Sequence, residues 1–250
     1  MPTSLSVIII VRNEAHQIRN CLETVRFADE IIVLDSGSTD GTPDIVREYT
    51  PHVHETDWPG FGPQKNRALA YATQEWVLSI DADERVSPAL RAEITAAITT
   101  PTHNGYRMPR RSSYCGRFIR HGGWWPDYVT RLFRRPHGQF TDARVHESVV
   151  VPGPIGTLTE PLIHYSFRDL DEVLRKVNHY STEGALRLQA SHRKAGLGTA
   201  IGHGLWTFLR CYLLKAGFLD GREGFILAVS NAEGTYYRYL KLMYLQRNQP

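Results

Sequence analysis

The 250-residue sequence is poor in cysteine and has no disulfide or zinc pattern. Its three cysteines, Cys21, Cys115 and Cys211, are an odd number, lie far apart and form no CxxC pair. Small secreted domains and zinc-binding modules instead carry paired cysteines at short spacing. We therefore exclude a disulfide framework and a zinc site, and we expect a reducing compartment.

Long apolar runs are also missing. The first run, Leu5 to Val11, is too short for the hydrophobic region of a secretory signal, and Arg12 follows without a small-residue cleavage site. In the most apolar later segment, residues 205–215, Arg210 and Lys215 interrupt the run. Because a spanning helix needs about 20 apolar residues, we expect a cytoplasmic protein without a transmembrane helix.

Acidic residues are scarce in one stretch. Between Arg107 and His137 there is a single acid, Asp127. The same stretch contains eight arginines: Arg107, Arg110, Arg111, Arg117, Arg120, Arg131, Arg134 and Arg135. The net charge of +3 conceals this segment, which suits an anionic partner, although a solvated basic face has the same composition.

The first hundred residues alternate between strand and helix patterns, within a composition that is 42% hydrophobic and 22% charged. Strands are predicted at four apolar runs, residues 5–11, 30–34, 52–56 and 76–80. Helices are predicted after them, around residues 18–25, from 42 onward, at 64–73 and at 87–98. Thr42-Pro43 and Ser87-Pro88 read as a cap followed by a first-turn proline. This alternation predicts an α/β fold with a mostly parallel sheet.

After residue 104 the pattern changes to short Gly- and Arg-rich strands, up to about His164. Three helices are then predicted, at roughly 169–191, 199–217 and 221–247. One face of the last helix is predicted to be apolar through Phe225, Val229, Ala232, Tyr236, Leu240 and Met243. The last two helices mix aromatic and basic residues, which suits a helix lying in lipid headgroups, but packing on the domain or a dimer contact fits equally well.

Polar clusters follow three of the predicted strands: Arg12-Asn13-Glu14, Asp35-Ser36-Gly37-Ser38 and Asp81-Ala82-Asp83-Glu84. In open α/β sheets, ligands bind outside the carboxyl ends of the strands. The carboxylates after the fourth strand repel one another, so they need either a cation or water around them. Mg²⁺ or Mn²⁺ takes one or two carboxylates plus phosphate oxygens, which suits a nucleoside diphosphate.

Four motifs in this order resemble the family-two inverting glycosyltransferases with the GT-A fold: Val7 to Glu14, Asp35 to Thr42, Lys65 to Leu69, and Asp81-Ala82-Asp83. Later segments look like the bacterial lipopolysaccharide core β-1,4-glucosyltransferase subgroup: Trp124 to Asp127, Arg131 to Arg135, Val145 to Glu147, and Phe218 to Phe225. The resemblance implies a GT-A-type, Rossmann-like sheet flanked by helices, with a C-terminal helical appendage.

The resemblance also implies roles for individual residues. Seven are expected to bind the donor: Val11, Asn13, Glu14, Asp35, Lys65, Arg67 and Asp81. Asp83 is expected to hold Mg²⁺ or Mn²⁺ with His164 as a further ligand, although a histidine in a strand is often a structural residue. Glu84 and Asp40 are expected to be solvated or capping residues.

Inversion requires a carboxylate that deprotonates the attacking hydroxyl. Many relatives carry this base in a Glu-Asp pair, which the corresponding region lacks. We expect Glu147 to be the base, with Asp127 in reserve. Arg131, Arg134 and Arg135 are expected to bind the acceptor, because arginine forks match phosphate geometry.

Residues 1–167 are accordingly predicted to form the glycosyltransferase domain, with a nucleotide-sugar half at 1–100 and an acceptor half at 101–167. Residues 168–250 are predicted to be a helical extension that contacts an anionic membrane surface at the inner face of the cell membrane or forms a homodimer. The expected activity is transfer of a hexose, glucose favoured, from a UDP-sugar to a lipopolysaccharide core or related glycolipid or phosphorylated oligosaccharide, with no nucleic acid partner.

Two other functions stay open at this point, a polyprenyl-phosphate sugar synthase and a non-catalytic nucleotide-binding module. A haloacid-dehalogenase-type phosphohydrolase fits less well, because its Asp-x-Asp pair follows the first strand, whereas here the pair follows the fourth.

Overall fold

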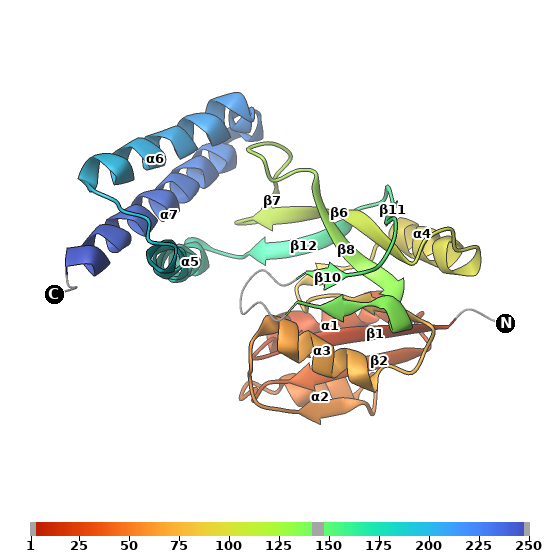
Figure 1. Cartoon of the computed structure of the whole chain (residues 1–250). Helices are drawn as coiled ribbons and strands as arrows, with labels where there is room; N and C mark the ends of the chain where they lie inside the picture. Colours follow the sequence, from red (N-terminus) through yellow and green to blue (C-terminus); the bar gives the residue numbers. More distant parts are fainter. Residues whose placement is uncertain (1–3, 142–147, 248–250) are drawn as a thin grey trace. The chain divides into compact units, whose positions relative to one another are not determined.

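The computed structural model describes residues 4–141 and 148–247 (Figure 1). The chain folds into two compact units. Unit 1 consists of Met1–Arg110 and Asp127–His164, and unit 2 of Arg111–Pro126 and Tyr165–Pro250. The polypeptide thus leaves unit 1, returns to it, and leaves it again.

Unit 1 is built on a sheet whose first part is parallel. Its parallel strands are β3 (Val53–Glu55), β2 (Glu30–Asp35), β1 (Leu5–Val11) and β4 (Trp76–Ser79), which lie side by side in that order. Every residue of β1 is buried, as its unbroken apolar run predicts for a strand covered on both faces. All four strands expected in the first hundred residues are therefore confirmed.

Helices cover both faces of this parallel part. They are α1 (Ala15–Val25), α2 (Thr42–Arg47), α3 (Phe61–Tyr71) and α4 (Pro88–Thr99). Alternate residues of β1 point to opposite faces, so Val7 and Ile9 join one core with α1 and α4, while Ile8 and Ile10 join a second core with α3. This layering is visible in Figure 1.

The cap and proline patterns predicted the starts of α4 and α2 to within one residue. The Ser87 hydroxyl accepts a hydrogen bond from the Leu90 amide at 3.1 Å, so the predicted cap of α4 is confirmed. The cap of α2 is Gly41, one residue before the predicted Thr42, and Gly41 has a left-handed φ of 82°. Helix α3 begins at Phe61, three residues before the predicted start.

The rest of the sheet is largely antiparallel. Strand β8 (Asp127–Arg134) pairs with β4, and β6 (Gly105–Tyr114) pairs with β8, so the overall order is β3-β2-β1-β4-β8-β6-β12-β5. The remaining strands of this sheet are β5 (Glu84–Arg85), β7 (Arg117–Phe118), β11 (Gly156–Thr157) and β12 (Leu162–Phe167). Strands β9 (Gln139–Phe140) and β10 (Val149–Val150) form a separate antiparallel pair after a 3₁₀ turn, η1, at Arg135–His137. The expected α/β fold is confirmed, with parallel pairing concentrated in its first part.

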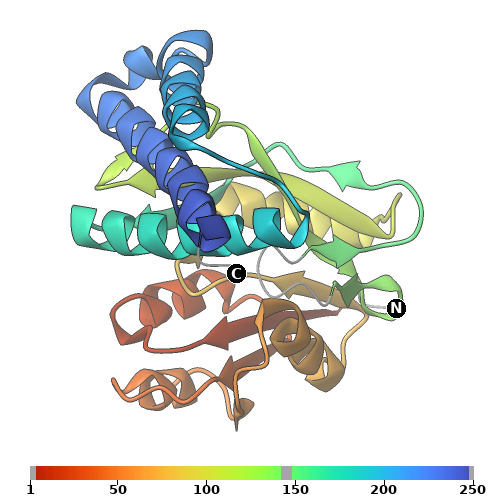
Figure 2. The ribbon, with the colours of Figure 1, turned by 60° about the vertical axis from the view of Figure 1, so that its left-hand side comes forward.

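Unit 2 is mainly helical. It contains α5 (Leu170–Ala190), α6 (Leu197–Leu209), the π turn η2 (Arg210–Leu214), the 3₁₀ turn η3 (Gly217–Asp220) and α7 (Gly221–Arg247). The three predicted helices are confirmed, although the middle one ends in a π turn. Figure 2 shows α6 lying along α7. Among the described residues, no helix has both the length and the apolar character needed to cross a membrane.

None of the residues on the apolar face predicted for the last helix is fully buried, and Phe225 is 46% exposed. The buried positions of α7 are instead Gly224, Leu227, Ala228, Ser230 and Leu242. Helix α7 contacts both α5 and α6, and the small residues among its buried positions permit that close approach.

Candidate active site

The loops after β1 and β2 are joined by hydrogen bonds at the carboxyl edge of the parallel strands. The Asn13 side-chain oxygen accepts from the Thr39 amide at 2.8 Å, and the Asn13 amide donates to the Ser38 hydroxyl at 2.8 Å. Asn13 has a left-handed φ of 57°, a conformation that asparagine tolerates better than most residues. The Glu14 amide donates to the Thr42 hydroxyl at 2.9 Å. Asn13 and Glu14 therefore border the loop that follows Asp35.

Asp40 ties the same two loops together as a capping residue. Its Oδ2 accepts from the Ala15 amide at 3.0 Å at the start of α1, and its Oδ1 accepts from the Thr42 amide at 3.1 Å. These bonds to amides in the first turns of α1 and α2 agree with the expectation that Asp40 is a solvated or capping residue.

Asp35 ends β2 and is 1% exposed. Its Oδ1 accepts from the amides of Gly37 at 2.9 Å and Ser38 at 2.7 Å. Its Oδ2 is buried and has no hydrogen-bond partner among the described residues. Val11 lies beside Asp35 in the β1–β2 register and is buried in the core. Burying a carboxylate oxygen without a hydrogen-bond donor is costly, so a ligand that donates a hydrogen bond to Oδ2 would stabilise the site.

Helix α3 packs its first turns against these loops. The Gln64 amide nitrogen donates to the hydroxyls of Ser36 at 2.9 Å and Thr56 at 2.6 Å. Arg67 lies nearer the surface, where it pairs with Asp57 at 2.6 Å. Lys65, between them in the sequence, is only 2% exposed.

A network of protein cations surrounds the carboxylates that follow β4. Lys65 Nζ lies 3.0 Å from Asp81 Oδ1, and Arg131 Nη2 lies 2.6 Å from Asp81 Oδ2. Burial alone would raise the pKa of Asp81, but the charges of Arg131 and Lys65 outweigh it and hold that pKa well below its usual range. The repulsion noted in the sequence is thus offset in part by the protein itself.

Glu84 is the centre of this network, and the expectation that it is solvated or capping is wrong. Its side chain is fully buried. Its Oε1 accepts from Arg131 at 2.7 Å and lies 3.6 Å from Arg110 Nη1, while its Oε2 accepts from the Asp81 amide at 2.9 Å. Arg110 in turn donates to Asp127 Oδ2 at 2.6 Å. The burial of Glu84 could not be predicted from its neighbours in the sequence, because its main partner, Arg131, lies 47 residues away.

Asp83 and His164 form a separate pair. Asp83 Oδ2 lies 3.2 Å from His164 Nε2, because β12 pairs with β5 and places His164 opposite Glu84. This is the one hydrogen bond of the Asp83 side chain within residues 4–141 and 148–247. The lysine and arginines that neutralise Asp81 and Glu84 thus leave Asp83 to His164.

The Asp83–His164 pair fits a divalent cation that has two protein ligands. A carboxylate oxygen and an imidazole nitrogen suit Mn²⁺, and Mg²⁺ accepts few protein ligands when phosphate oxygens complete its shell. Among the described residues, no group of three or more histidine, cysteine or acidic side chains converges as a metal site. The remaining ligands would therefore have to come from the substrate and water.

The arginines expected to bind the acceptor do not lie together. Arg131 is buried on Asp81 and Glu84. Arg134 pairs with Glu75 at 2.6 Å, and Arg135 donates to the Gln74 carbonyl at 3.2 Å. Since β8 runs antiparallel to β4 with Arg134 opposite Trp76, these two arginines lie at the amino end of β4, away from Asp81.

The structure describes only one of the two candidate bases. Glu147 lies outside the described residues. Asp127 begins β8 with its side chain 43% exposed, and Arg110 holds its Oδ2 through both Nη2 and Nε. Among the described residues, its Oδ1 makes no hydrogen bond.

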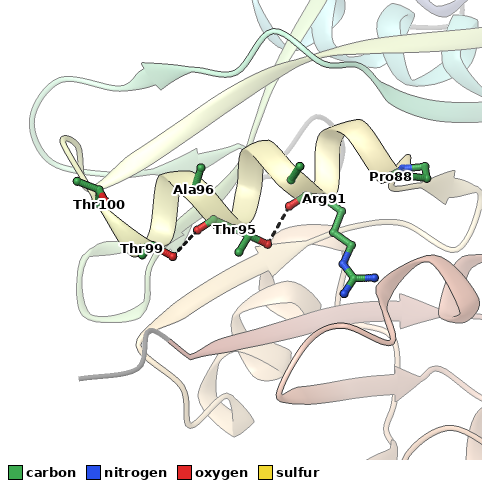
Figure 3. Close-up of a pocket in the computed structure, with 7 residues that line it drawn as sticks. Pro88, Arg91, Thr95, Ala96, Thr99 and Thr100 are labelled. Atoms are coloured by element: carbon green, nitrogen blue, oxygen red, sulfur yellow. Dashed lines mark hydrogen bonds between the residues drawn. The ribbon is translucent and has the colours of Figure 1, made fainter.

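A shallow hollow along α4 offers no competing site. It is lined by Pro88, Arg91, Ala92, Thr95, Ala96, Thr99 and Thr100 (Figure 3). The Thr95 hydroxyl donates to the Arg91 carbonyl at 2.9 Å and the Thr99 hydroxyl to the Thr95 carbonyl at 2.7 Å, so both hydroxyls are engaged within the helix (Figure 3).

Comparison with known proteins agrees with this geometry. Residues 6–158 match glycosyl transferase family 2. The lipopolysaccharide core biosynthesis glycosyltransferase LpsC of Rhizobium meliloti (strain 1021) is 33% identical over 242 residues, which cover 91% of this chain and 87% of LpsC. An uncharacterized glycosyltransferase of Rickettsia prowazekii (strain Madrid E) is 29% identical over 95% of this chain and 86% of its own length.

Solved structures give a more distant likeness. S. aureus TarS in complex with UDP-GlcNAc aligns over 98% of this chain and 92% of that chain, with a TM-score of 0.48 and 17% identity. In another crystal structure of S. aureus TarS the match covers 66% of this chain and 37% of that chain, with a TM-score of 0.47. Because the family match covers more than half of the sequence and LpsC is 33% identical over most of it, the chain belongs to glycosyl transferase family 2.

Proposed function

We propose that this glycosyltransferase moves a hexose, with glucose the first candidate, from a UDP-sugar to a lipopolysaccharide core or related glycolipid. The observation that carries the proposal is the Asp83–His164 pair at the carboxyl edge of the sheet, beside a carboxylate network already neutralised by protein cations. The similarity to LpsC, named for lipopolysaccharide core biosynthesis, supports this acceptor class.

The nucleoside is bound at the loops after β1 and β2. A ring N–H of the base donates to Asp35 Oδ2, a buried oxygen that accepts no hydrogen bond from the described residues. Asn13 and Glu14 hold the neighbouring loop in place through their contacts with Ser38, Thr39 and Thr42.

The diphosphate would lie next to Asp83 and His164, which would hold Mg²⁺ or Mn²⁺. When bound, such a cation supplies positive charge that stabilises the departing nucleoside diphosphate. Asp81 stays ionised beside Lys65 and Arg131 and accepts hydrogen bonds from hydroxyls of the ribose or the donor sugar.

Inversion requires a carboxylate on the face opposite the diphosphate, where it takes the proton of the attacking hydroxyl. Glu147 is the first candidate. Asp127 is the second, because Arg110 fixes one of its oxygens while the other can accept a proton and the side chain is partly exposed.

The test is release of nucleotide from a panel of UDP- and GDP-sugars, with and without Mg²⁺ or Mn²⁺. We expect release from UDP-glucose, and a loss of roughly 100-fold or more in Asp83→Asn, since a metal-held charge contributes several kcal/mol to the transition state. Mn²⁺ binding measured by electron paramagnetic resonance in the presence of UDP should weaken in parallel. Asp44→Asn is the matched control, because Asp44 is an exposed carboxylate paired with Arg47.

Three outcomes of this assay contradict parts of the proposal. Asp83→Asn with full activity rules out the metal site, and nucleotide binding without release from any sugar nucleotide indicates a binding module. Glu147→Gln and Asp127→Asn identify the base: we expect the larger loss at Glu147, and a larger loss at Asp127 reverses the assignment.

A further inference from the structure

Large apolar side chains cover the outward side of α6 and the turns after it. We call these residues the α6 patch: Leu197, Ile201, Leu205, Trp206, Leu213, Leu214, Phe218 and Leu219. Each has about half of its surface exposed or more, up to 67% for Leu214. Single exposed apolar residues are normal, but a continuous group of them along one element marks an interaction surface.

Helix α6 buries small residues and exposes large apolar ones, which is the reverse of an ordinary surface helix. Its buried positions are the small residues Ala200 and Gly204. A Cβ added at Gly204 would lie 3.2 Å from the Tyr236 Cβ and 3.4 Å from the Ala232 carbonyl oxygen, so Gly204 permits close approach to α7. A helix that packs through its smallest residues and exposes its largest apolar ones has a second apolar surface to cover.

The segment that carries the patch has charges of one sign. Between Glu183 and Asp220 the sequence has no acidic residue. The same segment has five basic residues, all exposed: Arg187, Arg193, Lys194, Arg210 and Lys215. Within the part of the chain that the structure describes, none of the five forms an ion pair. Arg193 and Lys194 precede α6 while Arg210 and Lys215 follow it, so cations bracket a helix about 20 Å long.

We propose that the α6 patch docks on the surface of an anionic phospholipid bilayer, with the apolar side chains at the acyl boundary and the five cations on lipid phosphates. Helix α6, with 13 residues, is too short to span a bilayer but suits an interfacial position. A second copy of the chain is a poorer occupant, because a symmetric contact would bring two sets of these cations together without acids from the same segment. This inference goes beyond the transfer reaction and does not depend on its donor.

The test uses the full chain and flotation with vesicles of phosphatidylcholine alone or mixed with phosphatidylglycerol. We expect binding to the mixed vesicles only, and weaker binding as salt increases. Arg193→Glu with Lys194→Glu should weaken binding at least about tenfold, since two cations that attract the anionic surface become anions that it repels. Leu205→Glu with Leu214→Glu should also abolish flotation.

Arg26→Glu with Arg91→Glu is the matched control, because it makes the same change in net charge on exposed residues of unit 1. It should bind as the unaltered chain does. Equal loss in the control, or full binding by both patch variants, overturns the proposal. A dimer in sedimentation that Leu205→Glu dissociates, with no flotation by the unaltered chain, assigns the patch to a second copy instead. Nucleotide release without vesicles should be unchanged in both patch variants, which separates this test from that of the transfer reaction.

Discussion

The two units of the chain use basic residues in different ways. In unit 1, Lys65 and Arg131 are 2% and 7% exposed and are held by Asp81 and Glu84. In unit 2, the basic residues of segment 184–219 are exposed and have no acid in their own segment. A cation among carboxylates fixes the position of those carboxylates, whereas an exposed cation beside apolar residues is available to a partner. Charge alone therefore does not distinguish a site from a docking surface; the neighbouring acids and the burial do.

The largest effect is expected where the unit 1 network is broken. Arg131→Met leaves Asp81 and Glu84 without their shared cation, and removing one partner of a buried ion pair typically costs about 3–5 kcal/mol. Urea or thermal unfolding measures the loss. Arg134→Met is the control on the same strand: its pair with Glu75 is partly exposed, so a change of at most about 1 kcal/mol is expected. Equal changes in the two variants would show that burial does not separate them.

A smaller effect is expected from the packing of unit 2. A Cβ added at Gly224 would lie 1.9 Å from the Gly217 carbonyl oxygen, so Gly224→Ala should destabilise the protein by about 1–3 kcal/mol. Gly202, on α6, has nothing within 4 Å of its added Cβ, and Gly202→Ala should stabilise it by about 0.5–1 kcal/mol. The melting temperatures of the two variants should move in opposite directions. Shifts of the same sign in both variants would contradict the difference in packing between Gly224 and Gly202.

The smallest effect concerns acid. The pKa of Asp81 is lowered in the folded state, so its contribution to stability is complete above its ordinary value near 4 and is lost as the pH falls below it. This group contributes a slope of up to about 1.4 kcal/mol per pH unit. Urea unfolding between about pH 3 and 6 should show a shallower dependence in Asp81→Asn than in the unaltered chain. Parallel curves would mean that Asp81 is not held by Lys65 and Arg131.

The sequence predicted what local patterns determine. The buried run of β1, the cap at Ser87 and the three C-terminal helices all depend on neighbours a few residues away. The return of residues 111–126 to the helical unit was not foreseen, because the core of Tyr114 and Ile119 with Val173 and Leu227 joins distant segments.

Contacts between residues far apart in the sequence also limited what could be predicted of the candidate site. The carboxyl ends of β1, β2 and β4 were located because each strand ends in a polar cluster. The buried position of Glu84 could not be read from its own surroundings, since Arg110 and Arg131 reach it from other strands. Asp83 and His164 were both named as metal ligands through resemblance, and their metal role stays a prediction although the fold places them 3.2 Å apart.

The bonds that tie the loops after β1 and β2 bear on how a nucleotide would bind there. Asn13, Asp40 and Thr42 hold both loops in one arrangement through contacts within the protein. The conformational entropy of these loops is therefore lost when the chain folds rather than when a ligand arrives. Such preorganisation favours lock-and-key association, and it makes the fixed spacing of the two loops a selector of ligand shape.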